Sequence, residues 1–425
     1  MLDIHFIREN AELVKKGMVA KGEPDTERVD TVLEKDKLWR DGLTELEKLR
    51  SENKSESKKI GALMGQGKKE DAQKIIDATS KRKERIKELE ENVGLFREER
   101  DNLLLNIPNV PHESVPEGSS EEDNEVVHTW GDPAPAEEAG KPHWELAEQH
   151  GWIDFKRGAK VTGAGFPFYV GPMARLQRAL INYFLSEATR RGYQEMIPPY
   201  VVNADSARGT GQLPDKEDMM YEIPRDELYA IPTAEVPVTN FYRDEILSAD
   251  QLPSQFAAYT PCWRREAGSY GADVRGLNRL HQFDKVELVK MVHPDNSYDE
   301  LENLRRDAES LLEALNLPYR TLLMCTGDMG FTQSKKYDME VWSPAQNRWL
   351  EVSSCSNFED YQARRLQLRF KEEEGGDTRL VHTLNGSGLA LPRVVAALVE
   401  TYQAEEGKVA IPEVLQLFYG GEWME

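Results

Sequence analysis

Apolar residues recur at helical spacing along a proline-free stretch of the chain from about Glu27 to Leu105. In its first half, one seven-residue register is apolar except at Asn53 and contains Val32, Trp39, Leu46 and Ile60. In its second half, the stripe recurs at alternating steps of four and three and includes two arginines: Ile75, Thr79, Arg82, Ile86, Leu89, Val93, Phe96, Arg100 and Leu103. Such spacing is typical of helices that pack along one narrow seam.

A turn divides this stretch into two helices of similar length. Gly65 and Gly67 flank Gln66, and glycines can end a helix and reverse the chain. We therefore expect an antiparallel coiled-coil hairpin over about residues 27–105. Helices of about 35 residues would make it roughly 50 Å long, at a rise of about 1.5 Å per residue.

The rest of the chain predicts a different architecture. Pro108 and Pro111 end the helical pattern, and residues 112–141 are rich in proline, glycine and acidic side chains. Shorter strands and helices follow, of which the helix over residues 174–191 is the clearest, and this mixture favours an α+β domain. We expect an N-terminal arm over 1–110, a linker over 111–142 and a second domain over 143–425.

The distribution of charge along the chain indicates one candidate RNA-binding segment. The chain has 425 residues and a formal charge of −22, which alone argues against a nucleic-acid partner. Residues 54–87, however, carry 11 Lys and Arg against 5 Asp and Glu, a net charge of +6 close to the predicted turn. That placement suits contact with RNA phosphates, whereas the periodicity alone is equally compatible with a dimerisation coiled coil. The candidate RNA-binding residues are Lys58, Lys59, Lys68, Lys69, Lys74, Lys81, Arg82, Lys83 and Arg85.

The sequence also bears on the cellular location of the protein and on whether its cysteines bind zinc. No apolar run reaches the roughly 18 residues that a membrane span needs, and the N-terminal sequence MLDIHFIREN has no signal-peptide pattern. We therefore expect a cytoplasmic protein without a membrane partner. The three cysteines, Cys262, Cys325 and Cys355, are widely spaced and form no CxxC pair, so we expect reduced thiols and no zinc site.

Residues 261–287 concentrate charged and aromatic side chains on a predicted strand pair. Because side chains alternate along a strand, Arg264 and Glu266 are expected to share one face. On the return strand the same face would carry Arg279, His281, Phe283 and Glu287. A guanidinium, an aromatic ring and carboxylates together indicate a nucleotide site, and the alternative is a solvated face with cross-strand ion pairs.

This segment resembles motif 2 of class II aminoacyl-tRNA synthetases. The first part of the motif corresponds to Trp263-Arg264-Arg265-Glu266 and the second to His281-Gln282-Phe283, and the following DKVE is similar to the seryl branch. Three further segments match the family in order, although each alone also fits an ordinary helix junction, a surface strand or a capped helix. They are a motif 1 element ending in Pro198-Pro199-Tyr200, a Thr233-Ala234-Glu235 element that we expect on a short strand, and a motif 3 element, Leu384 to Arg393, with Leu-Pro-Arg in place of the commoner Gly-Arg.

The resemblance to seryl-tRNA synthetases covers essentially the entire chain and implies a function. It implies a class II catalytic domain, an antiparallel β-sheet flanked by helices, that activates L-serine with ATP. Seryl-adenylate would then donate serine to the 3′ end of tRNA(Ser), and by the same resemblance of tRNA(Sec), with the arm as the tRNA-binding element. It also implies a homodimer. The alternative is a class II paralogue that activates an amino acid for another acceptor or acts as a regulator.

The resemblance also implies roles for individual residues. Arg264, Glu266 and Arg393 are the expected catalytic residues. ATP would contact these three together with Arg265, Phe283, Glu351, Val352, Ser353 and Ser354. L-serine would contact Thr233, Ala234, Glu235, Arg264, Glu287, Asn385 and Ser387, with Glu287 reading the hydroxyl group. Mg²⁺ would enter with ATP and bind Glu351 and Ser354.

Overall fold

The computed structural model describes residues 1–135, 137, 140–265 and 275–425 of the chain. Within it the chain forms two compact units. The first unit comprises Met1–Val19 and Glu23–Pro108, and the second comprises Ala20–Gly22 and Asn109–Glu425. Among the described residues, no helix is both long enough and apolar enough to cross a membrane.

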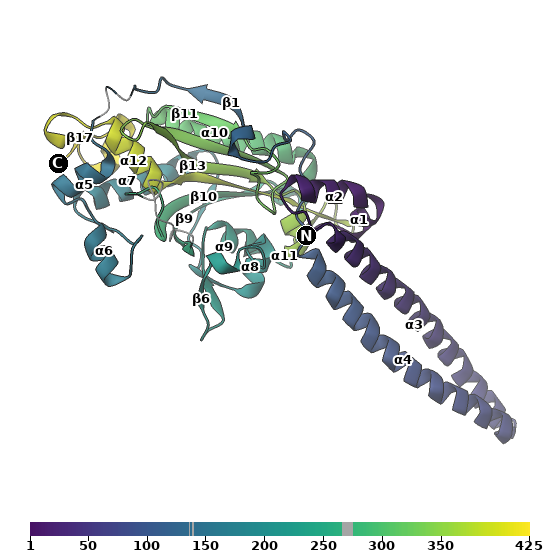
Figure 1. Ribbon diagram of the computed structural model, residues 1–425. Helices are drawn as coiled ribbons and strands as arrows, with labels where there is room; N and C mark the ends of the chain where they lie inside the picture. The colour runs from purple at the N-terminus through teal and green to yellow at the C-terminus, as the bar shows by residue number, and fades with distance from the viewer. Residues whose placement is uncertain (136, 138–139, 266–274) are drawn as a thin grey trace. The chain divides into compact units, whose positions relative to one another are not determined.

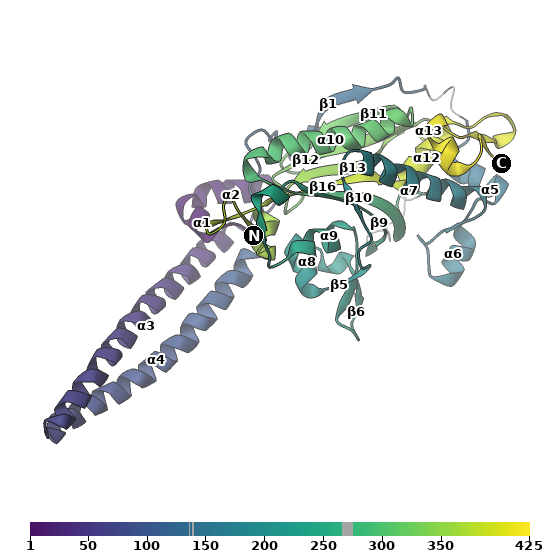
Figure 2. The ribbon, with the colours of Figure 1, turned by 180° about the vertical axis from the view of Figure 1, so that it is seen from behind.

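The first unit is built on a long helical hairpin. Helices α3 (Glu27–Gly65) and α4 (Lys69–Leu104) run side by side in both views (Figures 1 and 2), after two short helices, α1 (Ile4–Glu9) and α2 (Ala11–Ala20). The chain reverses at Gly67, whose φ of +75° is a conformation that glycine adopts without strain. The predicted coiled-coil hairpin is therefore confirmed.

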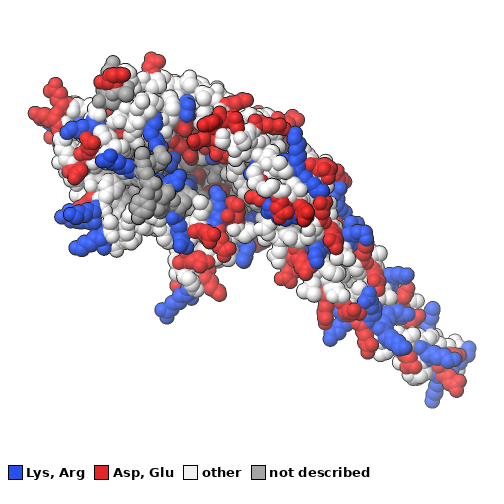
Figure 3. Space-filling model, in the orientation of Figure 1, with Lys and Arg blue, Asp and Glu red and all other residues white. Residues whose placement is uncertain are grey.

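Charged residues occupy part of the hairpin seam. The Asp36 side chain is fully buried, and Arg100 on the opposite helix donates to it at 3.4 Å. Arg40 and Arg8 lie 2.9 and 3.4 Å from the same carboxylate. The seam residue Arg100 is therefore balanced by a buried acid. An unpaired charge at this place would be costly. Figure 3 shows Lys and Arg interspersed with Asp and Glu along the whole arm.

The second unit contains an eight-stranded sheet in the order β1-β11-β12-β13-β16-β10-β9-β4. Its strands pair antiparallel except for β4 against β9. The bounds are β1 (Glu125–Trp130), β4 (Gln194–Met196), β9 (Ser254–Trp263), β10 (Gln282–Val292), β11 (Tyr319–Leu323), β12 (Lys335–Ser343), β13 (Arg348–Asn357) and β16 (His382–Ala390). The expected α+β class with an antiparallel-dominated sheet is confirmed.

Three amphipathic helices bury their apolar sides in one hydrophobic core with the strands of the large sheet: α7 (Pro172–Arg190), α10 (Ser297–Ala314) and α12 (Leu391–Thr401). The other helices are α5 (His143–His150), α6 (Phe155–Val161), α8 (Ala204–Thr210), α9 (Glu235–Thr239), α11 (Tyr361–Leu366) and α13 (Glu413–Tyr419). Small sheets complete the unit: β2 (Ile153–Asp154) with β3 (Phe168–Tyr169), β5 (Val201–Asn203) with β7 (Leu228–Ala230) and β6 (Tyr221–Ile223), β8 (Ile246–Ser248) with β14 (Arg369–Lys371) and β15 (Thr378–Leu380), and β17 (Val409–Ala410) with β18 (Trp423–Met424).

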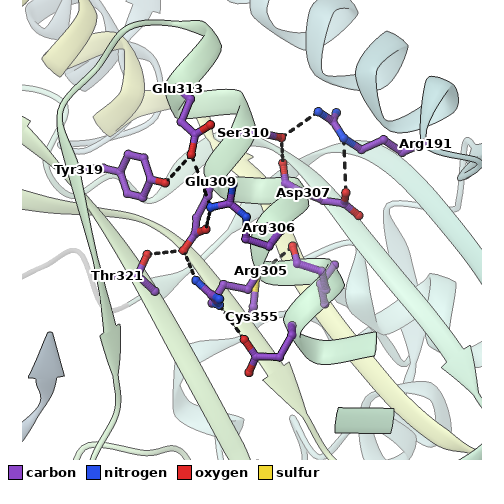
Figure 4. Close-up of polar contacts among 12 residues, drawn as sticks. Arg191, Arg305, Arg306, Asp307, Glu309, Ser310, Glu313, Tyr319, Thr321 and Cys355 are labelled. Atoms are coloured by element: carbon purple, nitrogen blue, oxygen red, sulfur yellow. Dashed lines mark hydrogen bonds and ion pairs between the residues drawn. The ribbon is translucent and has the colours of Figure 1, made fainter. Parts of the chain in front are cut away.

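A buried acid also ties α10 to the sheet. Glu309 is fully buried, pairs with Arg305 and Arg306 of its own helix, and accepts from Thr321 Oγ1 of β11 at 2.7 Å (Figure 4). Nearby, Arg191 Nε lies 3.3 Å from Asp307. Because every charge here has a partner, the network fixes the helix position on the sheet without leaving an isolated buried ion.

The predicted strand pair at 261–287 is only partly confirmed. Strands β9 and β10 pair as expected, with Phe283 opposite Cys262, but β10 begins at Gln282. The placement of Arg279 and His281 on the strand is wrong, since residues 275–279 form a turn and His281 donates its backbone N–H to Gly165. Arg264 follows the end of β9, and Glu266 lies outside the described residues.

Candidate active site

A cavity of about 350 Å³ opens in the second unit along strands β10, β12, β13 and β16. Its lining includes most of the residues that the sequence singled out. They are Thr233, Glu235, Arg264, Phe283, Glu287, Glu351, Val352, Ser353, Ser354, Asn385, Ser387 and Arg393. Segments far apart in the sequence therefore meet in one place, as a shared binding site requires.

Strand β10 contributes every second residue to one wall of the cavity. Phe283, Lys285 and Glu287 alternate with residues that face away from it. The guanidinium of Arg264 lies over the Phe283 ring, 5.2 Å from its centroid, and Arg264 Nε donates to the carbonyl oxygen of Pro232 at 3.3 Å. One face of the aromatic ring is thus already covered by a cation.

Buried polar side chains form one end of the cavity. The Lys285 ammonium pairs with Glu287 Oε2, and the Thr233 hydroxyl donates to the same oxygen at 2.7 Å. Glu287 is 1% exposed, so this carboxylate depends on protein donors in place of water. The arrangement suits a small polar ligand that can share the remaining hydrogen-bonding capacity.

The predicted short strand at Thr233 to Glu235 is wrong. Residues 232–234 form a bend and a turn that lead into α9, which begins at Glu235. The cause is local, because the Thr233 Oγ1 accepts a hydrogen bond from the backbone N–H of Glu235 at 3.2 Å, which favours a helical start over an extended chain. Both side chains nevertheless line the cavity.

Glu235 is held by two side-chain amides. Gln362 Nε2 donates to Oε1 at 2.7 Å and Asn385 Nδ2 donates to Oε2 at 2.6 Å. Burial raises the pKa of Glu235 to about 7, and the neighbouring Glu287 carboxylate adds to this rise. A cationic ligand beside Glu235 would therefore stabilise a charge that the protein alone holds poorly.

Arg393 marks another part of the cavity. It lies in the first turn of α12, and its Nε donates to the Asn278 carbonyl and its Nη1 to the Glu351 carbonyl, each at 2.9 Å. Burial alone would raise the pKa of Glu351, but the nearby cations of Lys336, Arg393 and Arg264 outweigh it and hold that pKa below its usual range. The Glu351 carboxylate is therefore ionised among three positive charges.

The oxygen donors around Glu351 fit a hard divalent cation. Ser354 Oγ lies 3.2 Å from Glu351 Oε1, and carboxylate and hydroxyl oxygens are ligands that Mg²⁺ accepts. The adjacent Asp338 lies 2.7 Å from Lys336 Nζ; burial raises the pKa of Asp338 to about 7 against the opposing effect of that ammonium, and Glu351 adds to the rise. Within the described part of the chain no group of three or more His, Cys, Asp and Glu side chains could hold a metal ion. A cation here would need further oxygens from a ligand.

Three predicted residues are not placed at the cavity. Arg265 is exposed and does not line it. Ala234 packs into a hydrophobic cluster with Val238 and Leu368. Glu266 lies outside the described residues.

The structure also adds residues that sequence reasoning missed. Lys285 had a detectable signal, because strand alternation places it on the same face as Phe283 and Glu287. Gln362 had none, since it reaches Glu235 from a helix 127 residues away. Lys21 likewise had none: its ammonium donates to the carbonyls of Gly330, Phe331 and Gln333 and so holds a loop of which residues 331–333 line the cavity.

Two family models match the chain. Residues 1–111 match the seryl-tRNA synthetase N-terminal domain, and residues 220–402 match the tRNA synthetase class II core domain (G, H, P, S and T). The serine–tRNA ligase of Salinibacter ruber is 57% identical over 420 residues, which cover 99% of this chain and 98% of that protein.

Solved structures agree with these matches. The seryl-tRNA synthetase of Pyrococcus horikoshii complexed with ATP is 37% identical, with a TM-score of 0.95, and the likeness covers 100% of this chain and 99% of that one. The cytoplasmic serine–tRNA ligase of Naegleria fowleri in complex with AMP is 30% identical, with a TM-score of 0.88 and the same coverage. The likeness thus extends over both units of the chain.

Proposed function

Because the chain belongs to the seryl-tRNA synthetase family and is therefore a serine–tRNA ligase, we propose that its cavity holds ATP and L-serine side by side. The observation that carries this proposal is the wall formed by β10, where Phe283 and Glu287 face the same space. One strand would then present an aromatic surface to the nucleotide and a carboxylate to the amino acid.

L-serine occupies the end at Glu235 and Glu287. Its α-ammonium group pairs with Glu235, beside Thr233, and its hydroxyl donates to Glu287. The contacts from Thr233 and Lys285 are both on Oε2 of Glu287, so Oε1 is the oxygen we assign to the serine hydroxyl. Asn385 and Ser387 border the same space and limit its size.

ATP occupies the part bordered by Phe283, Glu351 and Arg393. Adenine stacks on Phe283, which requires either the ring face opposite Arg264 or a movement of that guanidinium. Arg393 binds the γ-phosphate, and Arg264 lies between the serine carboxylate and the α-phosphate. Glu266, which lies outside the described residues, accepts from the adenine amino group.

Mg²⁺ fits the oxygen donors at Glu351 and Ser354. When bound, it would supply positive charge to the phosphate oxygens of ATP. The chain's own contribution is to keep Glu351 ionised and to hold Ser354 beside it. Lys336 and Arg393 add fixed positive charge at the same place.

The first step forms seryl-adenylate. A serine carboxylate oxygen attacks the α-phosphorus, the bond from that phosphorus to the bridging oxygen breaks, and pyrophosphate leaves. No general base is needed because the attacking carboxylate is already ionised. The protein therefore works by positioning and by neutralising charge, chiefly through Arg264 and Arg393. In the second step a ribose hydroxyl at the tRNA 3′ end attacks the seryl carbonyl, the bond from that carbon to the phosphate oxygen breaks, and AMP leaves with release of the hydroxyl proton.

The arm binds the tRNA backbone through its exposed lysines. Lys58, Lys59, Lys68, Lys69, Lys74, Lys81 and Lys83 are exposed near the turn of the hairpin. Arg82 and Arg85 differ, because they pair with Glu56 and Glu45 of the opposite helix and so also hold the hairpin together. We assign the lysines to phosphate contact and these two arginines chiefly to the arm itself.

A homodimer and a cytoplasmic location complete the proposal. The motif 1 segment after β4 exposes Ile197 to 82%, which suits an apolar contact with a second copy. Sedimentation velocity should give twice the mass of one chain. Fractionation of the cells should recover the protein in the cytoplasmic fraction.

Serine-dependent ATP–pyrophosphate exchange followed by charging of tRNA(Ser) tests the function. The chain should catalyse both, and tRNA(Sec) should be charged as well. A protein that exchanges pyrophosphate with serine but charges neither tRNA would overturn the assignment of the acceptor. A protein without exchange would overturn the assignment of the cavity.

A further inference from the structure

His143 is a buried histidine outside the cavity, and both of its ring nitrogens are engaged. Its Nδ1 lies 2.7 Å from Glu400 Oε1, and its Nε2 lies 2.9 Å from the backbone N of Leu277. A backbone N–H only donates, so Nε2 must be the acceptor and Nδ1 must carry the proton that it donates to Glu400. His143 is 1% exposed, and therefore water does not compete for either bond.

Glu400 accepts hydrogen bonds from α5, from the end of β12 and from the turn that follows β12. Its Oε1 accepts from the His143 backbone at 3.1 Å, from the His143 ring, and from Gln346 Nε2 at 3.3 Å, while Ser343 donates to Oε2. The carboxylate thus joins α12 to α5 and to the end of β12. Helices α5 and α12 lie side by side in both views (Figures 1 and 2).

The turn at 275–278 is docked on α5. Gly276 has a φ of +66°, and a Cβ there would lie 2.2 Å from His143 Nε2, so only glycine lets the turn approach so closely. Arg275 lies over the ring of Trp144, 4.7 Å from its centroid. Arg275 and Leu277 of the turn are therefore held by Trp144 and His143 of α5, and Gly276 between them lies close to His143.

The same turn holds Arg393. The His143 ring accepts a hydrogen bond from the backbone N–H of Leu277. The carbonyl oxygen of the next residue, Asn278, accepts a hydrogen bond from Arg393 Nε at 2.9 Å. The Asn278 side chain donates to Gln346 at 2.8 Å, and Gln346 in turn donates to Glu400. Leu277 and Asn278 also line the cavity. A continuous set of bonds thus leads from His143 to the arginine assigned to the γ-phosphate.

We propose that His143 is a positioning residue that fixes the 275–278 turn and thereby orients Arg393 toward ATP. This inference rests on the proposed role of Arg393. His143 touches neither substrate in this account and lies outside residues 1–111 and 220–402, which match the family models. Its removal should affect ATP and leave serine binding unchanged, because Glu235 and Glu287 belong to another network.

Two amide substitutions separate the two bonds of His143. The amide of asparagine reaches the position of Nδ1, so His143→Asn keeps a donor for Glu400 and removes the acceptor for Leu277. The longer glutamine reaches the position of Nε2, so His143→Gln keeps that acceptor and removes the donor. If His143 served only to stabilise the fold, its substitutions would lower the melting temperature and raise the ATP KM in parallel.

The measurement is the KM for ATP and for serine in pyrophosphate exchange, beside the melting temperature. We expect His143→Asn to raise the ATP KM about tenfold, the loss typical of one hydrogen bond, with the serine KM unchanged. His143→Gln should keep the ATP KM near wild type but melt at a lower temperature. Trp144→Leu, which loosens the turn from its other side, should raise the ATP KM about threefold by the loss of a cation–π contact.

Arg393→Ala is the control that separates this inference from the proposed function. If Arg393→Ala raises the ATP KM while His143→Asn and Trp144→Leu do not, the positioning role is wrong and the ATP site stands. If Arg393→Ala itself leaves the ATP KM unchanged, the proposed role of Arg393 fails and the inference fails with it. Equal rises in the ATP and serine KM that follow the melting temperature in all variants would also overturn the positioning role. If neither His143 variant folds, Trp144→Leu decides.

Discussion

At the scale of single residues, we expect Glu235 to make serine binding depend on pH. Its pKa is raised to about 7, so in the serine-free protein the fraction of Glu235 in the neutral acid form increases as pH falls below 7. The α-ammonium group of serine favours the ionised form. Serine binding should therefore strengthen as pH rises through 7 and weaken as pH falls.

We predict that the serine KM rises as pH falls below 7, approaching about tenfold per pH unit once Glu235 is mostly protonated. The Glu235→Gln variant should bind serine weakly with a KM that barely changes with pH. Exchange kinetics at saturating ATP measure both, and the ATP KM serves as the internal control. A serine KM that stays flat across this range in the wild-type protein would remove Glu235 from the ammonium site.

The sequence predicted these residues to the extent that their signals were local. Strand alternation placed Phe283 and Glu287 together because both lie on one strand, and the same rule extends to Lys285. Gln362 and Asn278 could not be found this way, since they reach the site through folding contacts between distant segments. Their roles become visible only when hydrogen-bond partners are known.

At the scale of elements, the arm was predictable because its seam repeats locally, whereas its internal charge pairs were not. Arg100 stood out on the seam, but its partner Asp36 lies 64 residues earlier, and the match depends on the geometry of the turn. The prediction of a strand at Thr233 was wrong for a different, local reason. A single side-chain hydrogen bond to the backbone of Glu235 decided between strand and helix.

We predict that Asp36→Ala destabilises the arm by on the order of 2 kcal/mol, because Arg8, Arg40 and Arg100 lose the buried carboxylate that they share, while Arg100 keeps its pair with Asp101 at 2.7 Å. Hydrogen exchange of α3 and α4 amides in the full chain measures this as a lower opening free energy. The matched control is Asp41→Ala on the same helix. It breaks an exposed ion pair with Lys37 and should leave the hydrogen exchange of the arm unchanged. Equal effects of the two substitutions would show that burial of the pair is unimportant.

At the scale of the whole molecule, we assign serine activation and tRNA binding to different charged groups. The chain is acidic overall, and its basic excess lies in residues 54–87. We predict that changing the exposed lysines Lys58, Lys59, Lys68, Lys69, Lys74, Lys81 and Lys83 to alanine raises the tRNA KM by at least about tenfold and weakens its salt dependence. Serine-dependent exchange should stay at the wild-type rate.

The single substitution Lys37→Ala, at an exposed position of the arm outside this segment, is the control and should leave charging unchanged. If the multiple variant charges tRNA(Ser) normally at physiological salt, the arm does not bind tRNA through these lysines. If the rate of serine-dependent pyrophosphate exchange also falls, the substitutions have disturbed the catalytic domain as well as the contact with RNA.

The central claim is that one cavity activates serine and that Glu287 reads its hydroxyl. The most direct test is ATP–pyrophosphate exchange driven by serine and separately by alanine, in the wild-type chain and in Glu287→Ala and Glu287→Gln. The account predicts wild-type exchange with serine that exceeds exchange with alanine by on the order of 10⁴-fold, because alanine leaves a buried carboxylate without its partner. It also predicts that both variants lose the serine reaction while remaining folded. Equal wild-type exchange with alanine, or full serine-dependent exchange in Glu287→Ala, would contradict it.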